Sequence, residues 1–387
     1  MSRPLDGVRV IDFTTMIAGP AATRHLADCG AEVVKIEMVG EGDLLRGRYS
    51  VDLVSRYMFG LYNAGKKSVA LDLKTEAGLE AVRRLIASAD VVVENFRPGV
   101  MKRLGLDYET LAQQHPKLVY CSISGFGQDG PLAERPAYAP VVHAYSGLDI
   151  VLASLHGDGS PMKNAAVIAD VAAGAYGFSA ILAALLHRER NGKGSFVDVT
   201  LLESTMQMIG LQYQQAQAGV KPEPVPYPPL KTRDGAVIIP LIAPRSIFEM
   251  FKILGHEDWV GDPKYKTRDG LRQGRDAVLG ELEDWAARHT CQEVDAICAE
   301  AGIPCAIYNH PRDIWSDPQS LARGSFSTVK DKLGEFQVLN APFRLSSADC
   351  ETVPMVSLVG EYNEEVLKSV GYSEEDLARL AEQKVFG

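Results

Sequence analysis

One acidic side chain stands inside the most apolar stretch of the chain. Asp170 is the only acid or base between Asn164 and His187, a run rich in Ala, Gly and Val. A carboxylate in such surroundings needs a partner or a chemical task, because an isolated buried charge is costly. Two interpretations stay open. Asp170 caps the start of a helix, or its carboxylate is a nucleophile that the positive end of that helix keeps ionised.

Positive charge gathers in two places, although the 387-residue chain has a net charge of −10. Each group adjoins a strand-like segment: Lys66, Lys67 and Lys74 in the first, Arg97, Lys102 and Arg103 in the second. Loops at one edge of a parallel sheet bind phosphates through such cations and through helix N-termini. The residues Asn95-Phe96-Arg97-Pro98-Gly99 favour a ligand contact there. Solvated surface charge is the alternative explanation for both groups.

The segments around these residues alternate between strand and helix patterns, which predicts an α/β fold with a parallel sheet. Helices are predicted over 20–29 and 76–88 from their apolar spacing. The predicted strands are short β-rich runs bounded by Gly, Pro or charged residues: 8–13, 32–37, 68–73, 90–96, 118–124 and 195–200.

The second half of the chain predicts a smaller domain between two linkers. A helix over 201–218 precedes a segment with five prolines at 221–229, which cannot form a regular helix or a central strand. A strand and three helices follow, predicted at 236–241, 246–254, 275–289 and 291–301. A second linker at 317–324 would return the chain to the first domain. The tail over 361–382 predicts two short helices, separated at Gly371, that pack on the large domain.

Several enzyme classes are disfavoured because their sequence motifs are missing. The turn after the first strand, Thr14 to Pro20, holds one glycine instead of the three that a nicotinamide dinucleotide requires. There is no Walker loop, no His-Glu-x-x-His and no Gly-x-Ser-x-Gly. Dehydrogenase, NTPase, zinc protease and α/β-hydrolase activities are therefore disfavoured.

Composition bounds the surroundings of the protein. The six cysteines include no Cys-x-x-Cys pair, which predicts reduced thiols, no metal site and a cytoplasmic protein. No segment of signal-peptide type opens the sequence. The acidic net charge argues against nucleic-acid binding. Because Asp170 would be costly in hydrocarbon, the apolar run over 164–187 is expected to be a buried core helix, with no membrane contact.

Several ordered stretches over about two hundred residues resemble the class III CoA-transferase family, which includes formyl-CoA transferase, carnitine CoA-transferase and α-methylacyl-CoA racemase. The matching stretches are Pro4 to Phe13, Ala18 to Pro20, Gly30 to Glu37, Gly42-Asp43, Arg46-Gly47, Asn63, Lys66 to Ser68, Leu71 to Lys74, Asp90 to Phe96, Pro98-Gly99, Ser122, Gly125 to Gly127, Gly130-Pro131, Ile181 to Leu185, Arg188, Gly192 to Gly194 and Val197-Asp198.

The resemblance implies a fold and a site. The fold is a Rossmann-like large domain formed by residues 1–220 and 325–387, a smaller α+β domain over 230–316, and a ring-shaped subunit interlocked in a homodimer. Acyl-CoA and a carboxylic acid would be the substrates, with no tightly bound cofactor. Asp170 would be catalytic, and the CoA contacts would be Ile17, Ala18, Met38, Leu71, Asp72, Leu73, Lys74, Asn95, Phe96, Arg97, Arg103 and Tyr138.

The resemblance also implies transfer through an aspartyl anhydride and an aspartyl-CoA thioester. Two alternatives are a racemase and a non-catalytic CoA-binding paralogue. The racemase needs a His where this chain has Tyr138, and His143 lies five residues further on, so transfer is favoured. Formyl-CoA transferase has a Gln at the position of Ile17 and an Arg at the position of Met38, which disfavours oxalate as the substrate.

Overall fold

The computed structural model describes residues 2–47, 52–153, 160–220 and 227–386. The chain divides into two compact units, one of residues 1–221 and 321–387 and the other of residues 222–320. Most of the proline-rich segment predicted as a linker, residues 221–226, lies outside the described residues.

The first unit is built on six parallel strands in the order β3-β2-β1-β4-β5-β6. They are β1 (Arg9–Asp12), β2 (Glu32–Glu37), β3 (Lys67–Ala70), β4 (Val91–Glu94), β5 (Val119–Ser124) and β6 (Ser195–Thr200). This is the order of doubly wound folds, which bind ligands beyond the carboxyl ends of the strands. The predicted parallel α/β sheet is confirmed.

Helices cover both faces of the sheet, because its central strands are apolar on both sides. One face packs on α1 (Ala18–Asp28) and α9 (Ile168–Asn191). The other face packs on α4 (Glu76–Ala87), α5 (Val100–Leu104), α6 (Tyr108–Gln114), α18 (Asn363–Lys368) and α19 (Glu374–Glu382). The remaining elements of this unit are α2 (Leu44–Gly47), α3 (Asp52–Asn63), α7 (Ala139–Ser146), α8 (Leu148–Ala153), α10 (Leu201–Met208), α11 (Gly210–Gln217), β10 (Phe326–Asp331) and β11 (Gly334–Leu339).

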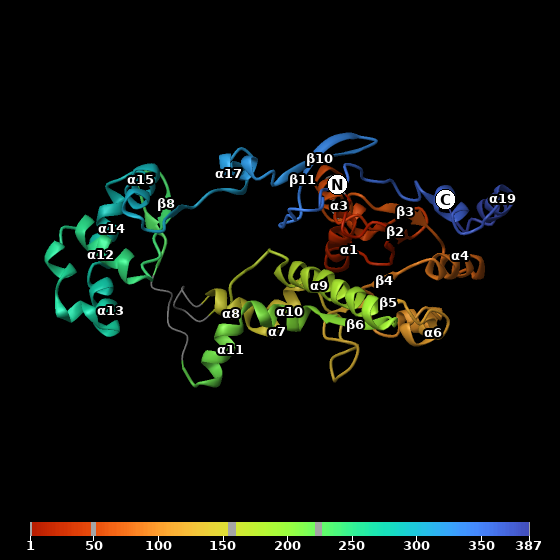
Figure 1. Cartoon of the computed structure of the whole chain (residues 1–387), viewed down its shortest axis with the longest axis horizontal. Helices are drawn as coiled ribbons and strands as arrows, with labels where there is room; N and C mark the ends of the chain where they lie inside the picture. Colours follow the sequence, from red (N-terminus) through yellow and green to blue (C-terminus); the bar gives the residue numbers. More distant parts are fainter. Residues whose placement is uncertain (1, 48–51, 154–159, 221–226, 387) are drawn as a thin grey trace. The chain divides into compact units, whose positions relative to one another are not determined.

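The two ends of the chain meet in this unit. In Figure 1 the blue C-terminal segment runs beside the orange strand β3, and its helix α18 contacts that strand. The Asn363 side chain accepts the N–H of Ala70 at 2.8 Å, and the N–H of Asp72 donates to the carbonyl of Val385 at 2.8 Å. The predicted pair of tail helices on the large domain is confirmed.

Helix α9 departs from the prediction of a buried core helix. Within the described residues it is the one helix long and apolar enough to cross a membrane by length and composition, and 44% of its most apolar window is buried. One face is made of small residues that pack on α1. The other face leaves Val171, Tyr176 and Leu186 between 40% and 52% exposed. The described residues of the first unit therefore leave a second apolar face of the helix exposed.

The second unit has a three-stranded antiparallel sheet, β7 (Leu230–Lys231), β8 (Ala236–Ile238) and β9 (Ala306–Ile307). Its apolar core is shared with helices around that sheet. The helices are α12 (Pro244–Ile253), α13 (Arg268–Ala277), α14 (Leu279–Ala287), α15 (Cys291–Ala301) and α16 (Pro311–Ile314), with 3₁₀ turns at Glu257–Val260 and Pro263–Lys266.

Several predicted boundaries were wrong for local reasons. The strands predicted to reach 73 and 96 end at Ala70 and Glu94, because side chains there accept backbone N–H groups and turn the chain, as Glu94 does from Phe96. The helix predicted over 275–289 is two helices. The first starts at residue 268 because the Thr267 side chain caps it by accepting the N–H of Gly270.

Two further boundaries also differ. The helix predicted over 201–218 is broken at Ile209, which has φ −116° and ends α10. The return linker predicted at 317–324 contains the short helix α17 (Pro318–Ala322). Proline in the first turn favours a helix there, because the missing N–H has no intrahelical partner in any case.

Candidate active site

A cavity of about 770 Å³ lies in the first unit at the carboxyl ends of β1, β2 and β3. Its lining residues are Phe13, Thr14, Thr15, Lys35, Ile36, Glu37, Met38, Val39, Glu41, Gly42, Asp43, Leu44, Leu71, Asp72, Leu73, Lys74, Phe96 and Leu104. Six of the predicted CoA contacts are among them. The volume is typical of a site for a small molecule or cofactor, and the edge is the one where doubly wound sheets bind ligands.

The lining of this cavity includes an ion pair that the sequence interpretation missed. Lys35 is 1% exposed, and its Nζ donates to the carbonyl of Thr14 at 2.6 Å and pairs with Asp43 Oδ2 at 2.8 Å. Burial alone would lower the pKa of Lys35, but Asp43 and Asp12 raise it above its ordinary value. The ammonium therefore stays charged. Its signal in the sequence is a lysine inside the apolar strand Val33-Val34-Lys35-Ile36.

A second buried pair lies behind the first. Lys66 Nζ is 3.1 Å from Asp12 Oδ2 and also donates to Thr23 Oγ1 at 2.7 Å and Asn63 Oδ1 at 2.9 Å. Burial would raise the pKa of Asp12, but Lys66 and Lys35 hold it below its ordinary value. The prediction that Lys66 is a phosphate-binding or surface cation was wrong, because the fold encloses its ammonium group.

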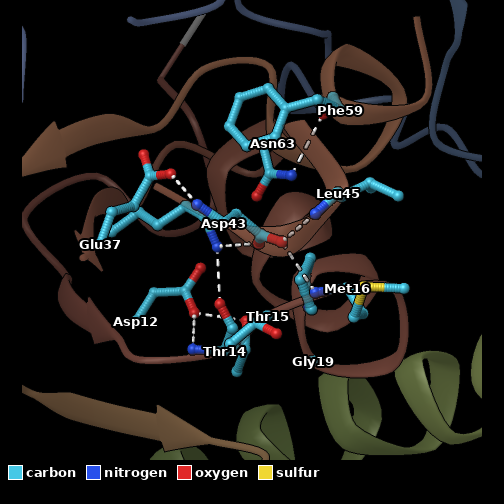
Figure 2. A network of polar contacts seen from close by, with 12 residues as sticks. Asp12, Thr14, Thr15, Met16, Gly19, Glu37, Asp43, Leu45, Phe59 and Asn63 are labelled. Carbon is cyan, nitrogen blue, oxygen red and sulfur yellow. Dashed lines mark hydrogen bonds and ion pairs between the residues drawn. The ribbon is translucent and has the colours of Figure 1, made fainter. Parts of the chain in front are cut away.

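The loop between β1 and α1 is held in an unusual conformation at the rim of the cavity. Met16 has φ +67°, in the left-handed region that favours glycine. Figure 2 shows how Asp43 fixes it: Asp43 Oδ1 accepts the N–H of Met16 at 3.1 Å and that of Leu45 at 2.8 Å. For a residue other than glycine, this backbone conformation costs about 1–3 kcal/mol and persists only where the surrounding structure imposes it. The loop is therefore rigidly positioned.

Asn95 holds the same loop from the other side. Its Oδ1 accepts the N–H of Thr15 at 2.8 Å, and its Nδ2 donates to the carbonyl of Thr15 at 2.8 Å. The amide is thus engaged in both directions by the protein itself. The structure gives Asn95 a role in loop geometry, which the prediction of a direct CoA contact did not include.

Asp170 lies in the first turn of α9 and does not cap it. The helix starts at Ile168, and the N-cap residue Val167 has no side chain that could accept an N–H. Burial raises the pKa of Asp170 to about 6, and among the described residues no cation pairs with the carboxyl group to oppose this. Val167 therefore occupies the predicted N-cap position of Asp170, whose carboxylate instead accepts its own backbone N–H. A half-buried carboxyl group without a cation is left, and such groups cluster at functional sites.

The position of α9 is set by close packing on α1. A Cβ on Gly174 would lie 2.7 Å from the Cβ of Ala21 and 2.9 Å from the carbonyl oxygen of Ala18, so only glycine fits. A Cβ on Gly177, one turn further along α9, would lie 3.4 Å from that of Ala22. On α1, the contacts of both glycines thus fall between Ala18 and Ala22. Asp170 lies one turn before Gly174 on α9.

The other predicted contacts lie outside the 770 Å³ cavity. Ile17 and Ala18 are 5% and 3% exposed at the start of α1, which leaves chiefly their backbone for a ligand. Arg97 is exposed and lines a separate cavity of about 340 Å³. Arg103 is exposed on α5, and Tyr138 is 58% exposed before α7. Lys67 is engaged by Glu32 and Glu365.

These features define a class of protein. The first unit combines a doubly wound sheet, a cavity at its carboxyl edge and a rigid loop at the rim. The adjoining helix carries a carboxyl group that pairs with no cation among the described residues. Together these are features of an α/β enzyme that binds a nucleotide-sized ligand. The comparison with known families agrees with this and is more specific. The chain belongs to CoA-transferase family III, whose model matches residues 5–355.

Relatives of known activity and structure support that membership. The chain is 33% identical to the mouse (Mus musculus) succinyl-CoA:glutarate CoA-transferase over 380 residues, which covers 95% of this chain and 86% of that protein. It is 30% identical to the formyl-CoA:oxalate CoA-transferase of Escherichia coli O157:H7 over 417 residues, covering 98% and 99%. The family supports transfer of CoA between an acyl-CoA and a carboxylic acid.

Two solved structures have the same fold. A CAIB/BAIF family protein from Brucella suis is similar at a TM-score of 0.81 and 32% identity, covering 96% of this chain and 100% of that one. The hypothetical protein Rv3272 of Mycobacterium tuberculosis is similar at a TM-score of 0.83 and 30% identity, covering 94% and 99%.

Proposed function

We propose that this enzyme moves CoA from an acyl-CoA donor to a carboxylic acid, with Asp170 as the covalent nucleophile. The observation that carries the proposal is the unpaired, half-buried carboxyl group in the first turn of α9. Its pKa of about 6 leaves it ionised at neutral pH, and it has little hydration to lose before it attacks.

The packing of α9 gives Asp170 a place beside the rigid loop. α1 follows β1 and α9 precedes β6 on the same face of a parallel sheet, so the two helices run in the same direction. Asp170 lies one turn before Gly174, which contacts Ala18, and would therefore fall on the side of the residues before Ala18. Those residues are the loop from Thr14 to Ile17, and Thr14 and Thr15 also line the 770 Å³ cavity. A ligand that extended from this cavity past the loop would bring its far end to the carboxylate.

The cavity suits the nucleotide end of CoA. Met38, Leu71, Leu73 and Phe96 supply apolar walls for an adenine ring. Lys74 is an exposed cation at the rim and could pair with a phosphate, whereas Lys35 is already paired with Asp43. The pantetheine arm would then run past the loop from Thr14 to Ile17, with its thioester at Asp170.

The chemistry balances without a net change in protons. An Asp170 oxygen attacks the thioester carbonyl and the C–S bond breaks. CoA departs as the thiolate, and an aspartyl acyl anhydride is formed on Asp170. The thiolate attacks the aspartyl carbonyl, which releases the donor acid as a carboxylate and leaves an aspartyl-CoA thioester. The acceptor carboxylate then attacks the aspartyl-CoA thioester, which expels CoA thiolate and forms a second anhydride. The thiolate attacks the acceptor's carbonyl in that anhydride, which gives the new acyl-CoA and restores the Asp170 carboxylate. Backbone N–H groups that stabilise each oxyanion would contribute about 3 kcal/mol apiece.

A racemase has less support from the residues in place. Tyr138 stands where a racemase needs a histidine, and its side chain is 58% exposed. His143 is fully buried, and its Nε2 is already an acceptor for the N–H of Ala169 at 3.1 Å. Neither residue therefore supplies the second base that a racemase needs, together with Asp170, to exchange the α-proton of an acyl-CoA.

The acceptor we propose is a dicarboxylic acid longer than oxalate, with succinyl-CoA as the donor. The similarity to the succinyl-CoA:glutarate enzyme supports this choice. Ile17 and Met38 differ from the Gln and Arg of formyl-CoA transferases, which speaks against oxalate. Ile17 has an aliphatic side chain and is buried, so it offers no polar group to a small acid.

The test of the proposed function is transfer together with a trapped adduct. Incubation with succinyl-CoA and glutarate is expected to give glutaryl-CoA, and incubation with succinyl-CoA alone to give a protein mass increased by a hydroxylamine-sensitive group. Formyl-CoA with oxalate serves as the comparison and is expected to react more slowly. Exchange of an α-proton in deuterated water without transfer or adduct would instead establish a racemase.

We further propose that a second copy of the chain covers the outward face of α9, as the family resemblance implies. Exposed apolar side chains also occur on the following helices, where Met208 of α10 and Leu211 of α11 are 50% and 67% exposed. Light scattering is expected to give twice the chain mass of 42.0 kDa. Leu186→Glu is expected to weaken the dimer, whereas Leu333→Glu, at the 78% exposed tip of the β10–β11 hairpin, is not. A monomeric wild-type protein would contradict the proposal.

A further inference from the structure

A buried histidine is bonded to the helix that carries Asp170. His143 lies on α7 and is 0% exposed, and its Nε2 accepts the N–H of Ala169 at 3.1 Å. Ala169 is the residue before Asp170 and is itself 0% exposed. The bond therefore joins the first turn of α9 to a separate helix at a point that water does not reach.

The first turn of α9 needs this bond. The first N–H groups of a helix have no intrahelical partner, and the N-cap side chain normally accepts one of them. Val167 cannot do so. Leaving a buried N–H unsatisfied costs about 1–3 kcal/mol. His143 thus replaces the missing cap from a distant part of the sequence.

The geometry fixes the state of the imidazole ring. Since Nε2 accepts an N–H, it carries no proton, and a neutral ring must carry its proton on Nδ1. Nδ1 has no hydrogen-bond partner among the described residues. Burial lowers the pKa of His143, against an opposing effect of Asp149. A ring in this state acts as a fixed acceptor, and its bonded nitrogen is not available as a base.

We propose that neutral His143 is a positioning residue that holds the first turn of α9, and through it the carboxylate of Asp170, in the place where it reacts. The inference rests on the proposed function of Asp170 and adds a second residue to it. A nucleophile displaced by about 1 Å can lose about a hundredfold in rate without any loss of substrate binding. The contribution of His143 would therefore appear in kcat.

The experiment compares two polar replacements that differ in reach. The side-chain amide of His143→Gln extends about as far as Nε2 and can accept the N–H of Ala169, whereas that of His143→Asn is one bond shorter. We expect His143→Asn to lower kcat ten- to a hundredfold with the KM for acyl-CoA within about twofold. We expect His143→Gln to restore most of that loss. Equal kcat values for the two variants, or a loss confined to KM, would overturn the proposal.

A second measurement does not depend on activity. In protein with ¹⁵N-labelled histidine, the nitrogen shifts of His143, assigned by their loss in His143→Gln, are expected to show the tautomer protonated on Nδ1. A ring protonated on Nε2 would overturn the proposal whatever the kcat values of the two variants. Absence of any transfer or adduct in the wild-type enzyme would instead refute the proposed function, and the tautomer would still report whether the bond to α9 exists.

Discussion

Replacing Asp170 with Asn is expected to abolish CoA transfer and to stabilise the fold. The amide has the shape of the carboxyl group but cannot form an anhydride, so a loss of at least about 10³-fold in kcat is expected, as for other covalent nucleophiles. The adduct seen with succinyl-CoA should vanish at the same time. Intact-mass measurement and steady-state assays check both effects.

The stability gain follows from the raised pKa of Asp170. The pKa is about 6 in the folded protein, against 3.8 for an unperturbed aspartic acid, so ionising the buried carboxyl group opposes folding. The penalty is fully present above about pH 6, decreases as the pH falls, and is absent below about pH 4. Asp170→Asn removes it, which should raise the free energy of unfolding by about 1–3 kcal/mol at pH 7.

Urea unfolding at pH 4 and pH 7 measures that window. Asp198→Asn is a suitable control, because partial burial also raises the pKa of Asp198, but this residue of β6 is more exposed and its charged neighbours are Asp129 and Glu203. It should retain transfer activity. An Asp170→Asn protein that still formed the adduct, or whose activity stayed within tenfold of wild type, would exclude Asp170 as the nucleophile.

Replacing Lys66 with Met is expected to be the most destabilising single change near the site. Its ammonium group donates to Asp12, to the carbonyl of Pro20, to Thr23 and to Asn63. Removal leaves these oxygens with one donor fewer and Asp12 with less compensation in a site that is 0% exposed. Breaking a buried pair in this way costs about 3–5 kcal/mol.

The neighbouring lysine provides a matched control. Lys67 carries the same charge one residue later, but its side chain is 30% exposed and its partners Glu32 and Glu365 are more exposed still. Lys67→Met should therefore cost no more than about 1 kcal/mol. Urea unfolding of both variants separates the cases. Equal effects would mean that the enclosure of Lys66 contributes nothing to stability.

The parts of the fold that could be predicted from the sequence are those where pattern and burial coincide. The strands at 32–37 and 195–200 were placed correctly because each is a β-rich run with a clear boundary at both ends. The helix predicted over 275–289 was wrong because the start of α13 is set by the cap at Thr267, in a polar segment without apolar spacing.

The sequence singles out the proposed nucleophile, but only part of the surroundings of the candidate site. Asp170 stands out as a lone acid in an apolar run, and the residues from Leu71 to Lys74 do line the cavity. Lys66 was misread because spacing reveals that charges are near each other but not which of them a fold encloses. Asp43 and His143 were missed as positioning groups because their partners are backbone N–H groups 27 and 26 residues away.

The contact between Gly174 and the backbone of α1 bears on how such an enzyme can change the acids that it accepts. Main-chain atoms, which every sequence shares, set the spacing of these two helices. Side chains elsewhere around the candidate site can therefore be exchanged in evolution without shifting the helix that carries Asp170. In such a scaffold the residues that recognise the acid can change while the position of α9 stays the same. This is consistent with relatives named for glutarate and for oxalate.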